Sequence, residues 1–151
     1  SGVSLKKHDP DKDKTDTQLA MEEAVRLGAQ EIEITAALGD RLDHSLANIQ
    51  LLYAALNSGV QACIVSKSSR VFLVDSECTL SGIRGATVSL LPLTLEAGGI
   101  TLKGFKWPLE DAAMRMGDPY GISNVVTADE AEITVASGIL IVTVIRGRET
   151  E

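Results

Sequence analysis

The sequence predicts two parts of different fold class, a parallel α/β arrangement over residues 1–68 and an antiparallel β-sandwich over residues 69–151. In the first part, helical and strand-like patterns alternate in the order helix, strand, helix, strand, which is typical of a parallel α/β sheet. In the second part, short strand-like runs follow one another without a helical period, which indicates a sandwich or barrel. The boundary is expected in the serine-rich stretch Ser66-Lys67-Ser68-Ser69.

The first helix is expected over Thr15–Leu27, where apolar residues gather on one side and charged residues on the other. Thr15, Asp16 or Thr17 can cap its start, because each offers a side-chain oxygen to the free N–H groups of the first turn. Gly28 follows the last turn and suits the left-handed conformation in which many helices end.

A short strand is expected at Glu31–Thr35, and a second helix follows it with Asp43 as its most plausible cap. An apolar strand is then expected at Val60–Val65. Two parallel strands cannot make a covered sheet on their own. We therefore expect further strands from a partner or from a segment before residue 1, and the start at Ser1, which is not a methionine, favours the second source.

The second part contains six strand-like runs separated by turns rich in Gly, Pro, Ser and Asp. These runs are Arg70–Val74, Thr87–Leu93, Gly99–Lys103, Ala112–Met116, Ala131–Ala136 and Ile139–Arg146. Ser137-Gly138 is interpreted as a two-residue hairpin loop that joins the last two of them. Trp107, the only tryptophan, is expected in the core.

The composition excludes several classes of protein. The net charge of −7 is spread evenly and leaves no basic patch, which argues against nucleic acid as a partner. The longest apolar run, at residues 138–145, is too short to span a membrane. Two cysteines without motif spacing indicate reduced thiols in a cytosolic protein. Zinc is improbable, because the only histidines, His8 and His44, are far apart in sequence.

An acidic stretch, Asp9-Pro10-Asp11-Lys12-Asp13-Lys14-Thr15-Asp16, leads into the first helix with four carboxylates and two lysines. Carboxylates this close repel one another unless a cation or the neighbouring lysines neutralise them. Oxygen ligands on a loop suit Mg²⁺ that arrives with the phosphates of a nucleotide. The alternative interpretation, a solvated and well-capped helix start, stays open.

A second candidate site is Gly39-Asp40-Arg41-Leu42-Asp43-His44, which lies where a strand ends and a helix begins. Ligands of open α/β sheets bind at the carboxyl ends of strands. Arg41 could contact phosphate oxygens, and Asp43 could cap the helix or hold a hydroxyl, a base or the arginine. A simple cap with a surface arginine is the alternative, and His44 is expected to be structural.

A third candidate is the loop Gly117–Asn124, in which Tyr120 could cover a flat ring while Ser123 and Asn124 hydrogen-bond a heteroaromatic ligand. The alternative is a β-turn punctuated by glycines. The chain has no Gly-x-Ser-x-Gly, Cys/His or Walker motif. Its acid, amide and guanidinium groups suit metal-assisted phosphoryl chemistry better than covalent catalysis.

Taken together, these stretches resemble bacterial thiamine pyrophosphokinase. The resemblance rests on Asp11–Thr17, Gly39–His44, Leu46–Asn48, Ser89–Leu93, Lys106–Leu109 and Gly121–Asn124. Their order and approximate spacing match along nearly the whole chain. The joint pattern is specific, although each piece alone is weak.

The resemblance implies a Rossmann-like, ATP-binding catalytic half over residues 1–68 and a β-sandwich that binds thiamine over residues 69–151. It implies Mg²⁺-assisted transfer of diphosphate from ATP to the hydroxyl of thiamine, giving thiamine diphosphate and AMP. The implied residues are Asp16 and Asp13 for catalysis, Asp16 for the metal, Arg41, Asp43 and Lys12 for the nucleotide, and Thr15, Ser123 and Asn124 for thiamine. It also implies a cytoplasmic homodimer with its sites at the subunit interface.

Two departures from the family pattern affect this interpretation. The family's Gly-Asp-Phe-Asp-Ser segment, whose aspartates help to bind the metal, is absent and would precede residue 1. Without it, we expect the 151-residue chain to lack catalytic activity. Asp40 replaces the second glycine of a Gly-Gly-Arg sequence and adds negative charge where triphosphate is expected. A non-catalytic module for ligand binding or dimerisation is therefore the alternative function.

Overall fold

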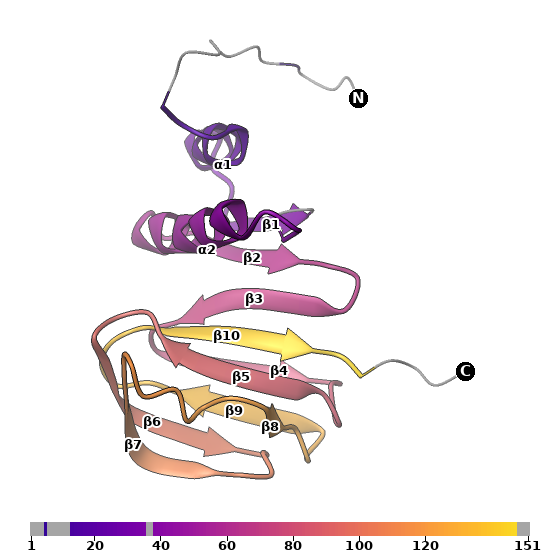
Figure 1. Ribbon diagram of the computed structural model, residues 1–151, viewed down its shortest axis with the longest axis vertical. Helices are drawn as coiled ribbons and strands as arrows, with labels where there is room; N and C mark the ends of the chain where they lie inside the picture. Colours follow the sequence, from indigo (N-terminus) through magenta and orange to yellow (C-terminus); the bar gives the residue numbers. More distant parts are fainter. Residues whose placement is uncertain (1–4, 6–12, 36–37, 148–151) are drawn as a thin grey trace.

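The computed structural model describes Leu5 and residues 13–35 and 38–147. These residues form two helices, at one end of the molecule in Figure 1, and ten strands. The helices are α1 (Asp16–Arg26) and α2 (Leu42–Asn57). The strands are β1 (Glu31–Thr35), β2 (Gln61–Val65), β3 (Ser69–Val74), β4 (Glu77–Ser81), β5 (Thr87–Pro92), β6 (Glu96–Lys103), β7 (Leu109–Arg115), β8 (Asn124–Val125), β9 (Glu130–Thr134) and β10 (Leu140–Ile145).

Six strands form a mixed sheet in the order β1-β2-β3-β10-β5-β8. β1 and β2 are parallel, as the alternation of helices and strands predicts, and every other pair in this sheet is antiparallel. β2 pairs with β3, so that Ile64 lies opposite Val71. Strands of the β-rich half therefore extend the parallel pair on its β2 side, whereas β1 is the edge strand of the described sheet.

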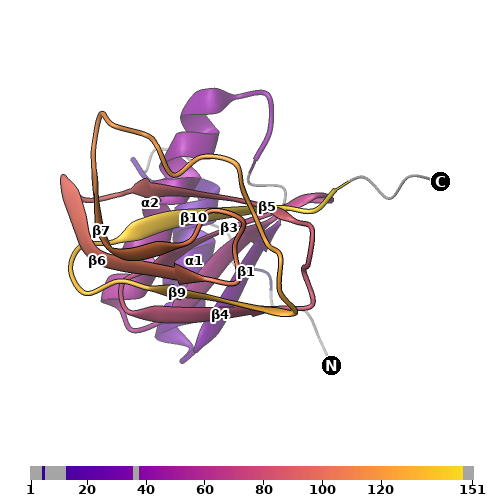
Figure 2. The ribbon, with the colours of Figure 1, turned by 90° about the horizontal axis from the view of Figure 1, so that it is seen from below.

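The other four strands form an antiparallel sheet in the order β4-β9-β6-β7. Figure 2 views the molecule from below, with this sheet nearer and the helices on the far side. The two sheets share one hydrophobic core. It includes Val88, Leu90, Leu140 and Val142 from the six-stranded sheet, and Ile100, Leu102, Met114, Ala131 and Ile133 from the four-stranded sheet. The β-rich half is therefore held together by its own core.

The helices cover the opposite face of the six-stranded sheet at its β1–β3 end. Leu52 of α2 packs with Ile64 and Val71 of the sheet. Met21 of α1 packs with Ala55 of α2, which layers one helix on the other. These two small clusters are what the α/β half buries, whereas the core between the sheets is much larger.

The starts of the two helices differ in how they are capped. The first helix is as expected: the Thr15 hydroxyl accepts a hydrogen bond from the Gln18 N–H at 3.2 Å, and Gly28 follows with a positive φ of 87°. The expected cap of the second helix is wrong. Asp43 lies inside its first turn, and the N-cap position is Arg41, whose side chain makes no capping hydrogen bond.

The expected hairpin at Ser137-Gly138 is also wrong. β9 belongs to the four-stranded sheet and β10 to the six-stranded sheet, so this turn carries the chain from one sheet to the other. Gly138 has a φ of +79°, and a Cβ there would lie 2.3 Å from the Glu96 carbonyl oxygen. The glycine is needed for close passage between the sheets, a use that looks the same in sequence as a hairpin turn.

Candidate functional site

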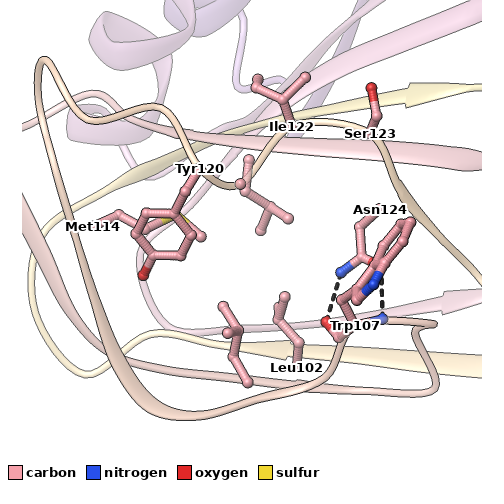
Figure 3. A pocket seen from close by; sticks show the side chains of 10 residues that line it. Leu102, Trp107, Met114, Tyr120, Ile122, Ser123 and Asn124 are labelled. Atoms are coloured by element: carbon pink, nitrogen blue, oxygen red, sulfur yellow. Dashed lines mark hydrogen bonds between the residues drawn. The ribbon is translucent and has the colours of Figure 1, made fainter.

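A pocket of about 350 Å³ opens in the β-rich half, between β5, β6, β7 and the loop from β7 to β8. It is lined by Leu90, Leu102, Trp107, Leu109, Met114, Tyr120, Gly121, Ile122, Ser123 and Asn124. Figure 3 shows the rings of Tyr120 and Trp107 at opposite sides, with aliphatic side chains between them. An apolar floor between two aromatic rings suits a flat, partly apolar ligand.

The loop that closes the pocket is pressed against β5. The Gly121 carbonyl accepts a hydrogen bond from the Leu90 N–H at 2.8 Å, and the Tyr120 hydroxyl donates to the Ala113 carbonyl. A Cβ at Gly121 would lie 2.5 Å from the Leu90 carbonyl oxygen and 2.8 Å from Met114 Cε. Only glycine lets the loop approach this closely, so residue 121 sets the shape of the pocket wall.

Ser123 has a left-handed backbone, with a φ of +62°, which is uncommon for a residue that is not glycine. Its N–H donates to the Ser89 hydroxyl at 3.0 Å, which helps to hold this conformation. The Ser123 side chain is exposed at the rim of the pocket (Figure 3). Its hydroxyl is therefore accessible to a ligand.

Asn124 and Trp107 lie next to each other at the other side of the pocket (Figure 3). Asn124 Nδ2 donates to the Trp107 carbonyl at 2.8 Å, and the Trp107 N–H donates to Asn124 Oδ1 at 3.1 Å. The expectation that Trp107 belongs to the core is wrong, because the residue is 54% exposed. The Lys106 ammonium lies 4.7 Å from the centroid of the indole ring, a cation–π distance.

The candidate residues before α1 are exposed. Lys12 lies outside the described residues, whereas Asp13, Thr15 and Asp16 lie at or just before the first turn of the helix. Lys14 pairs with Glu22 at 2.8 Å, and its hydrogen bond lowers the pKa of that carboxyl group. Lys14, expected to neutralise the acidic stretch, therefore pairs with a carboxylate of α1, that of Glu22.

The candidate residues at α2 pair with each other. Arg41 Nε donates to Asp43 Oδ1 at 3.0 Å and Arg41 Nη2 donates to Oδ2 at 2.7 Å, a two-bond fork. These bonds lower the pKa of Asp43 and raise that of the Arg41 guanidinium. Both side chains are exposed, at 72% for Arg41 and 66% for Asp43. The Asp43 carboxylate is therefore the partner of the Arg41 guanidinium in this structure.

The candidate residues therefore fall into three groups: those at the pocket, those at the start of α1 and those at the start of α2. Within the described residues, no hydrogen bond or ion pair joins Asp13 or Asp16 to the Arg41–Asp43 pair. Residues 13–35 and 38–147 contain no cluster of three or more His, Cys, Asp or Glu arranged to hold a metal. Neither helix of the described chain is long and apolar enough to cross a membrane.

Comparisons with known proteins identify the family. The model of the thiamin pyrophosphokinase catalytic domain matches residues 1–64, and the model of the thiamin pyrophosphokinase vitamin B1 binding domain matches residues 74–140. The chain belongs to the thiamine pyrophosphokinase family. The resemblance seen in the sequence is confirmed.

The sequences of individual thiamine pyrophosphokinases are similar to this chain, in agreement with the family assignment. The Bacillus subtilis protein is 29% identical over 140 residues, covering 91% of this chain and 65% of the relative. Thiamine pyrophosphokinase 2 of Oryza sativa is 32% identical over 112 residues, covering 71% of this chain and 41% of the relative. The chain thus spans less than two thirds of the length of either.

Solved structures of the family share the fold. The crystal structure of thiamine pyrophosphokinase from B. subtilis matches with a TM-score of 0.85 and 28% identity, covering 90% of this chain and 65% of that one. The structure from Geobacillus thermodenitrificans matches with a TM-score of 0.82 and 28% identity, covering 92% and 65%. The mixed sheet, the antiparallel sheet and the two helices are therefore an arrangement that the family has.

The family models divide the candidate residues between them. The residues that line the pocket all lie within the segment matched by the vitamin B1 binding domain, and those around α1 and α2 lie within the catalytic-domain match. Sequence reasoning missed Ser89, whose hydroxyl acts only through contact with a loop 34 residues away. It also misassigned Trp107, although the unusual Lys-Trp-Pro sequence between strands is a signal that could have favoured an exposed ring.

Proposed function

We propose that this chain belongs to an enzyme with thiamine pyrophosphokinase activity, the transfer of diphosphate from ATP to the hydroxyl of thiamine to give thiamine diphosphate and AMP. The observation that carries the proposal is the aromatic-walled pocket, which lies wholly within the vitamin B1 binding match. In the reaction, the thiamine hydroxyl oxygen bonds to the β-phosphorus of ATP, the hydroxyl proton is lost, and the bond from that phosphorus to the α–β bridging oxygen breaks. AMP leaves with the bridging oxygen.

The pocket between Trp107 and Tyr120 is the proposed place for the thiamine rings. Aliphatic side chains exclude water there, and an aromatic wall stacks well against a flat heteroaromatic ring. Ser123, with its exposed hydroxyl, and Asn124 are the substrate-binding residues of this half. Thr15, at the start of α1, is proposed to contact the substrate from the other half.

The start of α1 and the start of α2 are proposed to hold ATP. Arg41 offers a guanidinium fork that can pass from Asp43 to phosphate oxygens, and Lys12 adds a second cation. Asp16 and Asp13 are the proposed catalytic carboxylates. Their exposed oxygens fit Mg²⁺, because a nucleotide-bound Mg²⁺ needs only one or two carboxylates, and we assign Asp16 as the protein ligand. When bound, Mg²⁺ neutralises charge on the phosphates.

The proposed arrangement has a Rossmann-like ATP-binding part in residues 1–68 and a thiamine-binding β-sandwich in residues 69–151. We further propose a homodimer with its sites at the subunit interface. An interface would bring a pocket of one subunit near the phosphate-binding residues of the other, which is useful because the two groups of residues make no contact through described hydrogen bonds. Free Cys63 and Cys78 suit a cytoplasmic enzyme.

The proposal is tested by giving the natural protein that contains this chain thiamine, ATP and Mg²⁺ and measuring AMP, thiamine diphosphate and the shift in unfolding temperature. We expect thiamine to raise the unfolding temperature and W107A to abolish most of that rise. Asp16→Asn should lower the formation of AMP without changing thiamine binding. Thiamine binding without AMP would favour the non-catalytic module instead, and neither binding nor AMP would refute the proposal.

A further inference from the structure

The segment after β6 runs antiparallel to β8 and pairs with it along a short ladder. Phe105 and Val126 form a bridge, and the Lys106 N–H donates to the Val125 carbonyl at 2.8 Å. The same register sets Trp107 opposite Asn124. This rung lies at the pocket, since both residues line it.

Here the side-chain amide of Asn124 hydrogen-bonds the Trp107 backbone as a peptide group of a neighbouring strand would. The backbone of Asn124 is already paired with β5, where it lies opposite Val88. Its carboxamide instead exchanges two hydrogen bonds with the Trp107 backbone, one accepted at Oδ1 and one donated from Nδ2. This is the pattern of a hydrogen-bonded antiparallel pair. Two side-chain hydrogen bonds thus hold the Trp107 backbone beside β8, next to the main-chain bond from Lys106 to Val125.

The Asn124 carboxamide has little capacity left for a ligand. Oδ1 accepts from the Trp107 N–H and from the Val125 N–H, which uses both of its lone-pair directions. Nδ2 donates one of its two hydrogens to the Trp107 carbonyl. The residue is only 7% exposed. Bonds to the backbone of Trp107 and Val125 thus use three of the four hydrogen bonds that an asparagine side chain can make.

Trp107 has few other restraints. Its ring is exposed, and its identified ring contact is with the flexible, exposed side chain of Lys106. The next residue, Pro108, has no N–H with which to extend the ladder. The Asn124 carboxamide therefore supplies the hydrogen bonds that fix the backbone from which the indole projects.

We propose that Asn124 is a positioning residue that acts through Trp107: its carboxamide fixes the indole where it stacks on the bound thiamine ring. This rests on the proposed function, and it changes the role expected for Asn124 from a direct ligand contact to a support. Ser123 remains the residue of this turn that is proposed to contact the ligand directly. Loss of Asn124 should then weaken binding by freeing the indole.

The first test needs no ligand, because Trp107 is the only tryptophan and its fluorescence reports on this ring alone. We expect Asn124→Ala to lower the fluorescence anisotropy of Trp107 and to increase quenching by iodide. Asn57→Ala, an exposed asparagine at the end of α2, controls for the substitution, and Val135→Ala controls for a general loss of stability. If N124A does not fold, Asn124→Asp keeps an acceptor for the Trp107 N–H but places a carboxylate oxygen against the Trp107 carbonyl in place of the donor, and it should likewise lower the anisotropy.

The second test measures affinity. N124A should weaken thiamine binding about tenfold, in the range of one lost aromatic stack, and leave the affinity for ATP unchanged. Removing the ring itself with Trp107→Ala should make a further N124A substitution nearly silent, as expected if Asn124 acts through Trp107. Unchanged anisotropy in N124A, or additive effects in the double variant, would overturn the inference. A wild-type chain that binds no thiamine would instead refute the proposed function, while the anisotropy still decides whether Asn124 positions Trp107.

Discussion

The pocket around Trp107 and the charged start of α2 are built in different ways. Around the pocket, backbone and side-chain groups far apart in sequence are joined, as Leu90 is to Gly121 and Ser89 to Ser123. At α2, Arg41 and Asp43 are two residues apart and exposed, and their side chains are joined by a two-bond fork. One site depends on tertiary packing and the other on a local, solvent-exposed pair.

This difference suits the pocket and the start of α2 to different kinds of ligand group. A flat ring suits an apolar pocket with well-packed walls, and the pocket here is floored by core residues such as Leu90, Leu102 and Met114. Phosphate groups need mobile cations that can exchange one oxygen partner for another, which an exposed ion pair supplies at little cost in stability. Substitutions in the pocket should therefore change stability and binding together. Substitutions at the helix starts should leave most of the stability intact.

The largest effect is expected from Gly121→Ala. The added methyl group would meet the Leu90 carbonyl oxygen and Met114, and backbone at this position cannot move away cheaply. We expect the free energy of unfolding to fall by about 2 kcal/mol, as for other overpacked sites, and thiamine binding to be lost. Chemical denaturation and thiamine titration measure the two effects.

Gly147→Ala is the matched control, because a Cβ there meets nothing within 4 Å. It should change neither quantity. If G121A binds thiamine as well as the wild type, the pocket wall can adjust its packing. The proposed contrast between a packed pocket and an exposed ion pair at α2 would then be wrong.

A smaller effect is expected from Thr15→Ala at the start of α1. The substitution removes the hydroxyl that accepts the Gln18 N–H, which should cost about 1 kcal/mol of stability. Thr15→Ser keeps the cap and should restore stability. Urea unfolding of the two variants measures this, and T15A should leave the Trp107 fluorescence unchanged. An equal loss in T15S would show that the methyl group, and not the cap, carries the effect.

The sequence predicts the elements whose signals are local. Thr15 and Gly28 mark the ends of α1 through capping chemistry, and β3, β5, β6, β7, β9 and β10 each overlap an expected strand. The parallel pair β1–β2 also follows from the pattern. The sequence does not predict strand β4 at Glu77–Ser81: its five residues alternate between polar and apolar types, but the run is short and lies between the turn-forming residues Ser76 and Gly82.

Features that depend on long-range contacts could not be predicted in the same way. Gly138 looks like a hairpin glycine, but the chain crosses between the sheets there and passes close to Glu96 of β6. Asp43 looks like a helix cap, but Arg41 lies within reach and takes its carboxylate. Trp107 looks like a core residue until its pairing with Asn124 is known. In each case a partner outside the local pattern decides the outcome.

The smallest effect is expected from the ion pair at α2, and it should depend on pH. The hydrogen bond from Arg41 lowers the pKa of Asp43 from its ordinary value of 3.8, so folding favours the charged carboxylate. The stabilisation is therefore present at neutral pH and is lost as the pH falls below that value through the lowered pKa. Asp43→Asn should remove this acid dependence and cause only a small loss of stability at pH 7, because both partners are exposed.

Urea unfolding of the wild type and D43N from neutral to acid pH, at low and high salt, measures the difference directly. The difference in unfolding free energy between the wild type and D43N should vanish in acid. It should also shrink in high salt, since exposed charges are screened. A difference as large as that of G121A, or one unaffected by salt, would mean that Asp43 is part of a packed structure like the pocket. A small, screened difference would instead leave Arg41 free to exchange the Asp43 carboxylate for phosphate at low energetic cost, as the proposed binding of ATP at this helix start requires.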